Sequence, residues 1–273
     1  MYKLKNDLMF KMAFCTKNSK DNLMHFLKSI YNENIVQIEY EPFILEDKYI
    51  NTKKKYVDLI VQLDNGELIN IEINTSFKKY IRSRNASYLL SSYVQDIEKD
   101  KDYKKIDKHI QINFTWGLAK KYNIKESYKL RNESGKEVYI DSLEIIEYNM
   151  DKIMNSYYNK DEKIIKQYKP MIMLDLDAKE IRNLGNGDKF MEKMSKVVDD
   201  LNADKKLVRW ISDEEEIEKT RRSEILEAKE EGIEQTKKES AINFYKNGVS
   251  KETICQSLNI TSEQLNYYLN TKD

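Results

Sequence analysis

Apolar and polar residues alternate with a period of two along residues 56–63 and again along residues 68–74, with a short turn between them. This pattern predicts a β-hairpin that has one buried face. A three-residue loop with Gly66 in its left-handed bulge position pairs Val61 with Ile69 and leaves one face wholly apolar. A two-residue loop would shift the strands by one position and mix the two faces, so the pattern favours the three-residue loop.

The polar face of this predicted hairpin carries the candidate chemistry. The register sets Asp58 directly opposite Glu72, and Asn74 lies two residues further along the same face. Like charges that face each other across two strands repel, so this pair requires a divalent cation or a nearby basic side chain. The alternative interpretation is a solvated polar face on which two acids align by chance. The basic residues close in the sequence are Lys53, Lys54, Lys55, Lys78, Lys79, Arg82 and Arg84.

Further helical and strand patterns surround the hairpin and predict a mixed α/β domain with a small sheet. Helices are predicted over residues 7–14, with Asn6 or Asp7 as the cap, and over residues 22–30 and 85–98. The buried stripe expected for the third of these helices consists of Leu89, Tyr93, Val94 and Ile97. Strands are predicted over residues 34–39, 109–114 and 137–146, and residues 150–210 are predicted to be helical with breaks near Pro170 and at residues 185–187.

The C-terminal part of the chain changes in character. Residues 213–239 form a predicted helix in which acidic and basic residues recur four positions apart. Residues 241–273 have a helix-turn-helix layout, with Ser250 and Thr261 as the N-caps. The second helix of that layout, residues 262–268, contains no Lys or Arg to contact phosphates. A small packing or dimerisation module is therefore favoured over sequence-specific DNA binding.

Composition and charge restrict the class of protein. The chain of 273 residues is 34% charged and 40% hydrophobic, and its seven Gly and two Pro favour helix over tight-turn β architectures. It contains no run of about 18 apolar residues and no signal-peptide pattern, so we expect a cytoplasmic protein without membrane association. Residues 1–130 carry 23 Lys and Arg against 17 Asp and Glu. This excess favours an anionic partner for the first half of the chain.

Cysteine and histidine content restricts the metal chemistry. Cys15 and Cys255 are isolated in the sequence, and His25 and His109 are the only histidines. The cysteine spacing indicates neither a zinc site nor a disulfide, and the presence of only two histidines nearly excludes a multi-histidine site. A metal would therefore be bound by oxygen ligands, which hard ions such as Mg²⁺ or Mn²⁺ prefer.

Several motifs follow one another in a characteristic order. They comprise the helix at residues 6–14, Val57-Asp58-Leu59, residues 65–74, Arg84 with Tyr88, and Tyr93-Val94-Gln95. Together they resemble the PD-(D/E)XK nuclease family transposases, also called recombination-promoting nucleases, over residues 5–118. The resemblance implies an α/β fold with a restriction-endonuclease-like core, in which a mixed β-sheet is flanked by helices, followed by a mainly helical C-terminal region.

The resemblance also implies roles for the polar face of the hairpin. Asp58 and Glu72 would be catalytic carboxylates that bind Mg²⁺, with Mn²⁺ as an alternative, for phosphodiester hydrolysis. The third motif residue of the family is usually Gln or Lys, whereas this chain has Asn74. A lysine there would stabilise developing charge on the phosphate, whereas Asn74, as the third catalytic residue, could only hydrogen-bond the water or a phosphate oxygen.

Neighbouring side chains are candidates for this missing function. We expect Lys78 or Arg84 to position the phosphate, with ordinary surface positions as the alternative. Gln95 is a further candidate contact to DNA, against a capping or solvent-facing position on its helix. Asp7 is either an auxiliary acid or, more simply, a cap or first-turn residue of the first helix.

Two functions remain open from the sequence. The first is a Mg²⁺-dependent DNA endonuclease, related to transposases and acting in DNA recombination or in defence against foreign DNA. The second is a catalytically weak or inactive relative that binds nucleic acid or a protein. DNA is the expected partner, and strand-transfer chemistry would favour a homodimer. The predicted organisation is a nuclease-like domain (1–150), a helical extension packed on it (151–212), a charged helix (213–240) and a helix-turn-helix-like tail (241–273).

Overall fold

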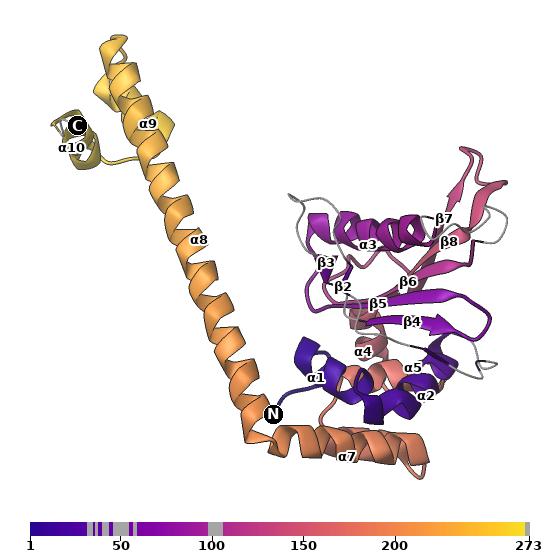
Figure 1. Cartoon of the computed structure of the whole chain (residues 1–273). Helices are drawn as coiled ribbons and strands as arrows, with labels where there is room; N and C mark the ends of the chain where they lie inside the picture. The colour runs from indigo at the N-terminus through magenta and orange to yellow at the C-terminus, as the bar shows by residue number, and fades with distance from the viewer. Residues whose placement is uncertain are drawn as a thin grey trace. The chain divides into compact units, whose positions relative to one another are not determined.

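The computed structural model describes residues 1–31, 35, 38–39, 44–45, 55–56, 59–97 and 106–270. The chain divides into two compact units, Met1–Val208 and Arg209–Asp273. In the first unit, six strands form one sheet in the order β1 (Ile38–Glu39), β4 (Leu59–Leu63), β5 (Leu68–Asn74), β6 (His109–Thr115), β8 (Val138–Asn149) and β7 (Lys125–Arg131) (Figure 1). A separate two-stranded sheet pairs β2 (Ile44–Leu45) with β3 (Lys55–Tyr56).

The six-stranded sheet is mixed. Strand β6 runs parallel to both of its neighbours, β5 and β8, whereas all the other neighbouring pairs are antiparallel. The sheet is flanked by helices on both faces (Figure 1). The predicted α/β fold with a mixed sheet is therefore confirmed.

The hairpin of β4 and β5 has the predicted register. Val61 faces Ile69, and the amide of Leu63 donates to the carbonyl of Glu67 across the loop at 2.8 Å. Gly66 closes this loop with a φ of +90°, a conformation that is open to glycine and strained for other residues. The alternating apolar residues Leu59, Val61, Ile69 and Ile71 thus select the pairing, because a shift of one strand by one residue would move its apolar set to the opposite face of the sheet.

One face of the sheet is apolar and is covered by most of the helices of this unit (Figure 1). They are α1 (Asp7–Phe14), α2 (Lys20–Ile30), α4 (Met150–Tyr158) and α5 (Glu162–Ile172). Helices α6 (Ala178–Gly185) and α7 (Lys189–Ala203) pack against each other, and α7 also packs against α1 and α2 (Figure 1). On this face, the ring of Phe114 lies 5.8 Å from that of Phe26 and stacks on that of Tyr148 at 5.6 Å. These large aromatic side chains bury much apolar surface and hold the helices against the sheet.

The ends of these helices follow the predicted caps and breaks. The side chain of Asn6 accepts a hydrogen bond from the amide of Met9 at 3.2 Å and so begins α1. Helix α5 contains Pro170 and is kinked at Tyr168, whose backbone is not helical, because a proline cannot donate in the helical ladder. Asn186 ends α6 in the left-handed conformation.

Helix α3 (Lys79–Ile97) covers the opposite face of the sheet and begins at Lys79 rather than at the predicted Asn85. The predicted basic stretch therefore lies largely within its first turns. Its buried residues are Ile81, Asn85, Tyr88, Leu89, Ser92 and Asp96. The predicted stripe is wrong at Val94, which is 50% exposed. The reason is that α3 packs on polar side chains of the sheet and buries polar residues of its own.

The other strands differ from the prediction in extent. The strand predicted at 137–146 is confirmed and extends to Asn149. Strand β7 was not predicted; it is a mostly exposed edge strand and has no apolar alternation. Of the strand predicted at 34–39, residues 35, 38 and 39 are described, and Ile38–Glu39 forms β1.

The second unit is helical. It contains most of α8 (Lys205–Lys246), then α9 (Lys251–Leu258) and α10 (Ser262–Asn270). Ser250 and Thr261 accept hydrogen bonds from the amides three residues later, so both predicted caps are confirmed. A small core joins the three helices and consists of Ala241, Ile254, Ile260, Leu265 and Tyr268.

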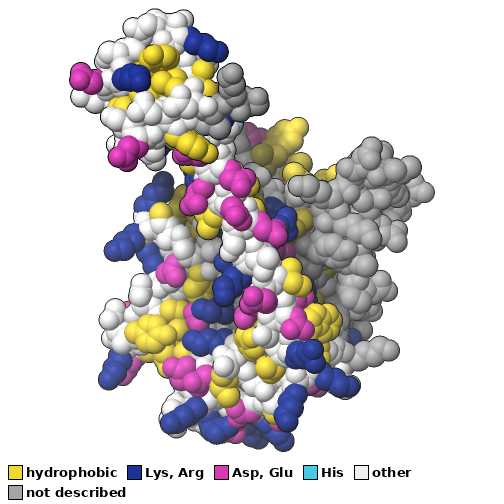
Figure 2. All heavy atoms as spheres, turned by 90° about the vertical axis from the view of Figure 1, so that its left-hand side faces the viewer, with side chains coloured by type: hydrophobic (Ala, Val, Ile, Leu, Met, Phe, Trp, Pro, Cys, Tyr) yellow, Lys and Arg dark blue, Asp and Glu magenta, His cyan; other side chains and the backbone are white. Residues whose placement is uncertain are grey.

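The charged helix α8 has the predicted pairs of opposite charge. Arg222 contacts Glu218 at 3.0 Å and Arg209 contacts Asp213 at 3.8 Å, each pair one turn apart. On the face drawn in Figure 2, Lys and Arg side chains are interspersed with Asp and Glu over the described residues. None of the helices in the described part of the chain combines the length and the apolar character that a membrane span requires.

Candidate active site

A layer of polar side chains lies between α3 and the sheet, and it is buried. Alternation along β5 and β6 turns every second side chain towards α3, and the parallel register pairs these side chains across the two strands. We call this set the polar layer: Asn70, Glu72 and Asn74 of β5 with Gln111, Asn113 and Thr115 of β6. Each of the six is at most 3% exposed, so their polar groups depend on one another and on α3 for partners.

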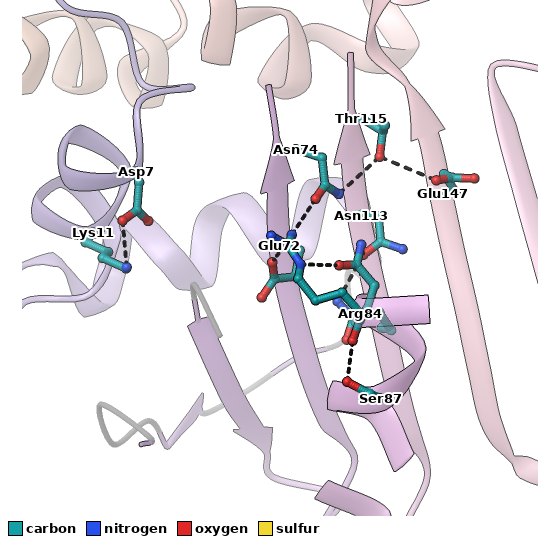
Figure 3. A network of polar contacts seen from close by, with 11 residues as sticks. Asp7, Lys11, Glu72, Asn74, Arg84, Ser87, Asn113, Thr115 and Glu147 are labelled. Atoms are coloured by element: carbon teal, nitrogen blue, oxygen red, sulfur yellow. Dashed lines mark hydrogen bonds and ion pairs between the residues drawn. The ribbon is translucent and has the colours of Figure 1, made fainter. Parts of the chain in front are cut away.

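Glu72, Asn74 and Arg84 meet at one point of this layer (Figure 3). One terminal nitrogen of Arg84, Nη2, donates to Oε2 of Glu72 at 3.1 Å and to Oδ1 of Asn74 at 2.7 Å. Glu72 is 2% exposed, whereas the side chain of Arg84 is 38% exposed. The guanidinium therefore reaches in from a half-open position and compensates a charge that is shielded from water.

Further hydrogen bonds fix α3 on the polar layer. Nε of Arg84 donates to Oδ1 of Asn85 at 3.2 Å. Nδ2 of Asn85 then donates to Oδ1 of Asn113 at 2.9 Å, and the same oxygen accepts from Nε2 of Gln111 at 3.0 Å. The position of Arg84 is thus set by packing beneath its helix.

A second glutamate closes the far side of the layer. Thr115 accepts from Nδ2 of Asn74 at 3.2 Å and lies 3.5 Å from Oε1 of Glu147 on β8 (Figure 3). Glu147 is 3% exposed, and Arg82 of α3 pairs with it at 2.7 Å. Burial alone would lower the pKa of Arg82, but the hydrogen bond and the charge of Glu147 outweigh burial and raise this pKa above its ordinary value.

Aromatic side chains surround the Arg82 guanidinium. Its nitrogens donate to the hydroxyls of Tyr122 and Tyr128, each at 3.2 Å. Its Cζ atom also lies 4.5 Å from the centre of the Tyr122 ring, a distance typical of a cation–π contact. Two arginines two residues apart on α3 therefore neutralise two buried glutamates on different strands.

The structure brings together some of the predicted site residues and separates others. It joins Glu72, Asn74 and Arg84, whereas Asp58 lies outside the described residues. Lys78 is exposed and lies just before α3. Within the described part of the chain it makes no polar contact with Glu72 or Asn74. Gln95 is half-buried on α3, about 16 Å along the helix axis from Arg84 at 1.5 Å per residue.

Asp7 has a local role. It lies in the first turn of α1 and pairs with Lys11 at 2.8 Å, apart from the polar layer (Figure 3). An acid at this end of a helix also interacts favourably with the helix dipole. The first-turn interpretation of Asp7 therefore accounts for its contacts.

Sequence reasoning missed several members of the network. They are Arg82 as the partner of a buried acid, and Asn85, Asn113, Thr115 and Glu147. The alternation along residues 109–114 signalled a polar face that includes Asn113. Its parallel pairing with β5, and the contact with Glu147, connect segments that are distant in the chain and carry no local signal.

The donor atoms at the Arg84 contact are those that a hard cation prefers. Oε2 of Glu72 and Oδ1 of Asn74 converge on one positively charged nitrogen, so two oxygens already point towards a single cationic position. Within the described ranges, no cluster of three His, Cys, Asp or Glu side chains could hold a metal. The residues present fit a divalent ion in oxygen chemistry, and a complete ligand set would need a further donor.

The chain was compared with models of protein families, with curated proteins and with solved structures. The model of the PD-(D/E)XK nuclease family transposases matches residues 4–228, which include the whole sheet, α3 and the polar layer. No match to the chain was found among the curated proteins or among the solved structures.

Proposed function

Because the chain belongs to the PD-(D/E)XK nuclease family transposases, we propose that it is a Mg²⁺-dependent endonuclease that hydrolyses phosphodiester bonds of DNA. Family membership supports a nuclease or transposase-related function. DNA recombination and defence against foreign DNA are the biological roles consistent with it. The observation that carries the proposal is the convergence of Glu72, Asn74 and Arg84 in the polar layer.

Oxygen atoms of β5 would hold the metal ion. Nucleases of this type generally use divalent metals, and Glu72 and Asn74 supply oxygens of the kind that Mg²⁺ or Mn²⁺ binds. Asp58 would supply the second carboxylate, because the sequence pattern of the hairpin predicts it opposite Glu72. The bound ion would activate a water molecule and neutralise charge on the scissile phosphate.

Arg84 would supply the positive charge that Asn74 lacks. Its guanidinium lies within hydrogen-bond distance of both β5 residues and is fixed by Asn85. Its partly exposed position leaves it accessible to a phosphate arriving from solvent. Arginine forms directed hydrogen bonds with phosphate oxygens, and a donor positioned in this way stabilises the charge that develops in the transition state.

Roles of the other regions complete the proposal. Residues 1–150 would form the catalytic domain, and residues 151–212 would support it from the apolar face. The charged helix at residues 213–240 and the tail at residues 241–273 would serve packing or assembly of a homodimer. We place the protein in the cytoplasm.

A plasmid-nicking assay tests the assignment. Supercoiled plasmid is incubated with Mg²⁺ and the full chain, or with Asp58→Ala or Glu72→Gln. Each variant should lower the nicking rate by about a hundredfold or more, as loss of one electrostatic group at an active site typically does. Asp7→Asn is the matched control, because it removes an acid that lies outside the polar layer.

The outcomes separate the two functions. Equal nicking by the wild type and both variants would show that the assigned site is wrong. If the folded wild-type protein does not nick at all, then the weak or inactive relative that binds nucleic acid or protein becomes the favoured function. DNA binding without cleavage, measured on the same plasmid, would support that outcome.

A further inference from the structure

Hydrogen bonds connect Arg84 to Glu147 through Asn74 and Thr115, across three adjacent strands (Figure 3). The direction of this chain is set at both ends. A guanidinium only donates, and a carboxylate in an ion pair with an arginine only accepts. Oδ1 of Asn74 must therefore face Arg84, its Nδ2 must face Thr115, and the hydroxyl hydrogen of Thr115 is directed to Glu147.

Burial prevents water from replacing these partners. Asn74 and Glu147 are each 3% exposed and Thr115 is fully buried. Reversal of the Asn74 amide would set its nitrogen against the donor of Arg84. It would also require the single hydrogen of Thr115 to turn from Glu147 to Asn74. Both changes leave buried polar groups without partners, which is costly in the protein interior.

We propose that Thr115 and Glu147 are positioning residues that hold the Asn74 amide with its oxygen directed towards Glu72. Asn74 then acts as a neutral oxygen ligand of the divalent cation, and its orientation is fixed by side chains on the neighbouring strands β6 and β8. This inference rests on the proposed function, since it specifies how the third motif position contributes to the same site. Arg82 acts further out, because its ion pair keeps Glu147 an acceptor.

Substitution of Thr115 tests the inference through metal affinity. Thr115→Val keeps the shape of the side chain and removes the hydroxyl, whereas Thr115→Ser keeps the hydroxyl. Mn²⁺ binding to the full chain is measured by titration calorimetry, beside the melting temperature of each variant. Loss of a residue that orients a metal ligand typically weakens affinity by about tenfold or more. We expect this loss for the valine variant and recovery to within about threefold of wild type for the serine variant.

A second background separates orientation from general destabilisation. Asn74→Asp presents an oxygen whichever way its carboxylate turns, so Thr115→Val should not weaken Mn²⁺ binding in that background. A structural defect would weaken binding in both backgrounds. If Thr115→Val does not fold, Glu147→Gln removes the fixed acceptor and should weaken Mn²⁺ binding only in the background that keeps Asn74.

The outcomes distinguish this inference from the proposed function. If Mn²⁺ binds wild type and Thr115→Val equally, or if the serine variant loses as much affinity as the valine variant, the positioning role is refuted while the metal site stands. Equal losses in the wild-type and the Asn74→Asp backgrounds also refute it. If the wild type binds no Mn²⁺, both the metal site and the inference fall.

Discussion

Moving a positive charge from α3 to β5 tests which residue supplies the cation of the site. In the double variant Asn74→Lys/Arg84→Ala, an ammonium on the strand replaces the guanidinium that now contacts Glu72 at 3.1 Å. If the role of Arg84 is its charge, this double variant should nick DNA faster than Arg84→Ala alone. The second substitution would then restore activity although it alters a residue of the site.

The magnitude follows from the contacts. Removal of one positioned donor typically lowers the rate by about a hundredfold to a thousandfold, which we expect for Arg84→Ala. Asn74→Lys alone places two cations near each other, and unit charges 4 Å apart repel by about 4 kcal/mol at an effective dielectric constant of about 20. The 38% exposure of the Arg84 side chain allows it to move into solvent and relieves part of this repulsion. We expect about a tenfold loss for that single variant and at least a tenfold recovery in the double variant, since tenfold corresponds to about 1.4 kcal/mol.

The assay is the initial rate of plasmid nicking at saturating Mg²⁺, measured for wild type, both single variants and the double variant. Arg84→Lys is the matched control, because it keeps the charge and loses only the planar hydrogen-bonding geometry. Melting temperatures establish that each variant is folded. Independent effects would multiply, so a double variant whose rate equals the product of the two single losses refutes the assignment of the charge to Arg84.

Three further outcomes follow from the structure. Gly66→Ala should lower the free energy of unfolding by about 1–2 kcal/mol, because residue 66 has a positive φ. The control variant Gly232→Ala in helix α8 should not be destabilising. Urea unfolding followed by circular dichroism measures the free energy of unfolding of both variants. Burial and a hydrogen bond to Glu234 raise the pKa of Tyr268 to about 12. The contribution of the neutral Tyr268 side chain to the stability of the second unit should therefore be complete below the unfolded pKa of tyrosine, about 10, and should disappear as the pH rises through 12. Hydrogen exchange of the amides of α10 should show this alkaline loss in wild type and a smaller one in Tyr268→Phe. Removal of divalent ions with a chelator should abolish nicking without unfolding the chain, and added Mg²⁺ should restore it, as measured in the same plasmid assay.

The hairpin was predictable because its sequence constrains it twice. The alternating apolar residues of the two strands are buried only when both sets share a face, and the position of Gly66 sets the loop. Either signal alone leaves an alternative register, but only one register satisfies both. The structure has this register, in which Val61 faces Ile69. Asp58, the residue expected opposite Glu72 across the hairpin, lies outside the described residues, so this pairing stays a prediction.

Other parts of the site were not predictable from local pattern. An apolar stripe was expected on α3, yet the helix packs on a polar surface, so Asn85 is buried and Val94 is half exposed. Glu147 joins the network through a parallel strand pair whose partners are distant in the chain. Such contacts depend on the order of strands in the sheet, which alternation within one segment does not encode.

The absence of a lysine at position 74 has a physical explanation in the division of tasks between β5 and α3. A buried Glu72 requires a counter-charge even in the absence of a metal ion, and Arg84 provides it from the helix at 3.1 Å. A second cation at position 74 would compete for the same carboxylate, whereas an amide oxygen accepts from Arg84 at 2.7 Å and strengthens its placement. The asparagine and the arginine are therefore energetically coupled, and a substitution at either position should change the effect of a substitution at the other.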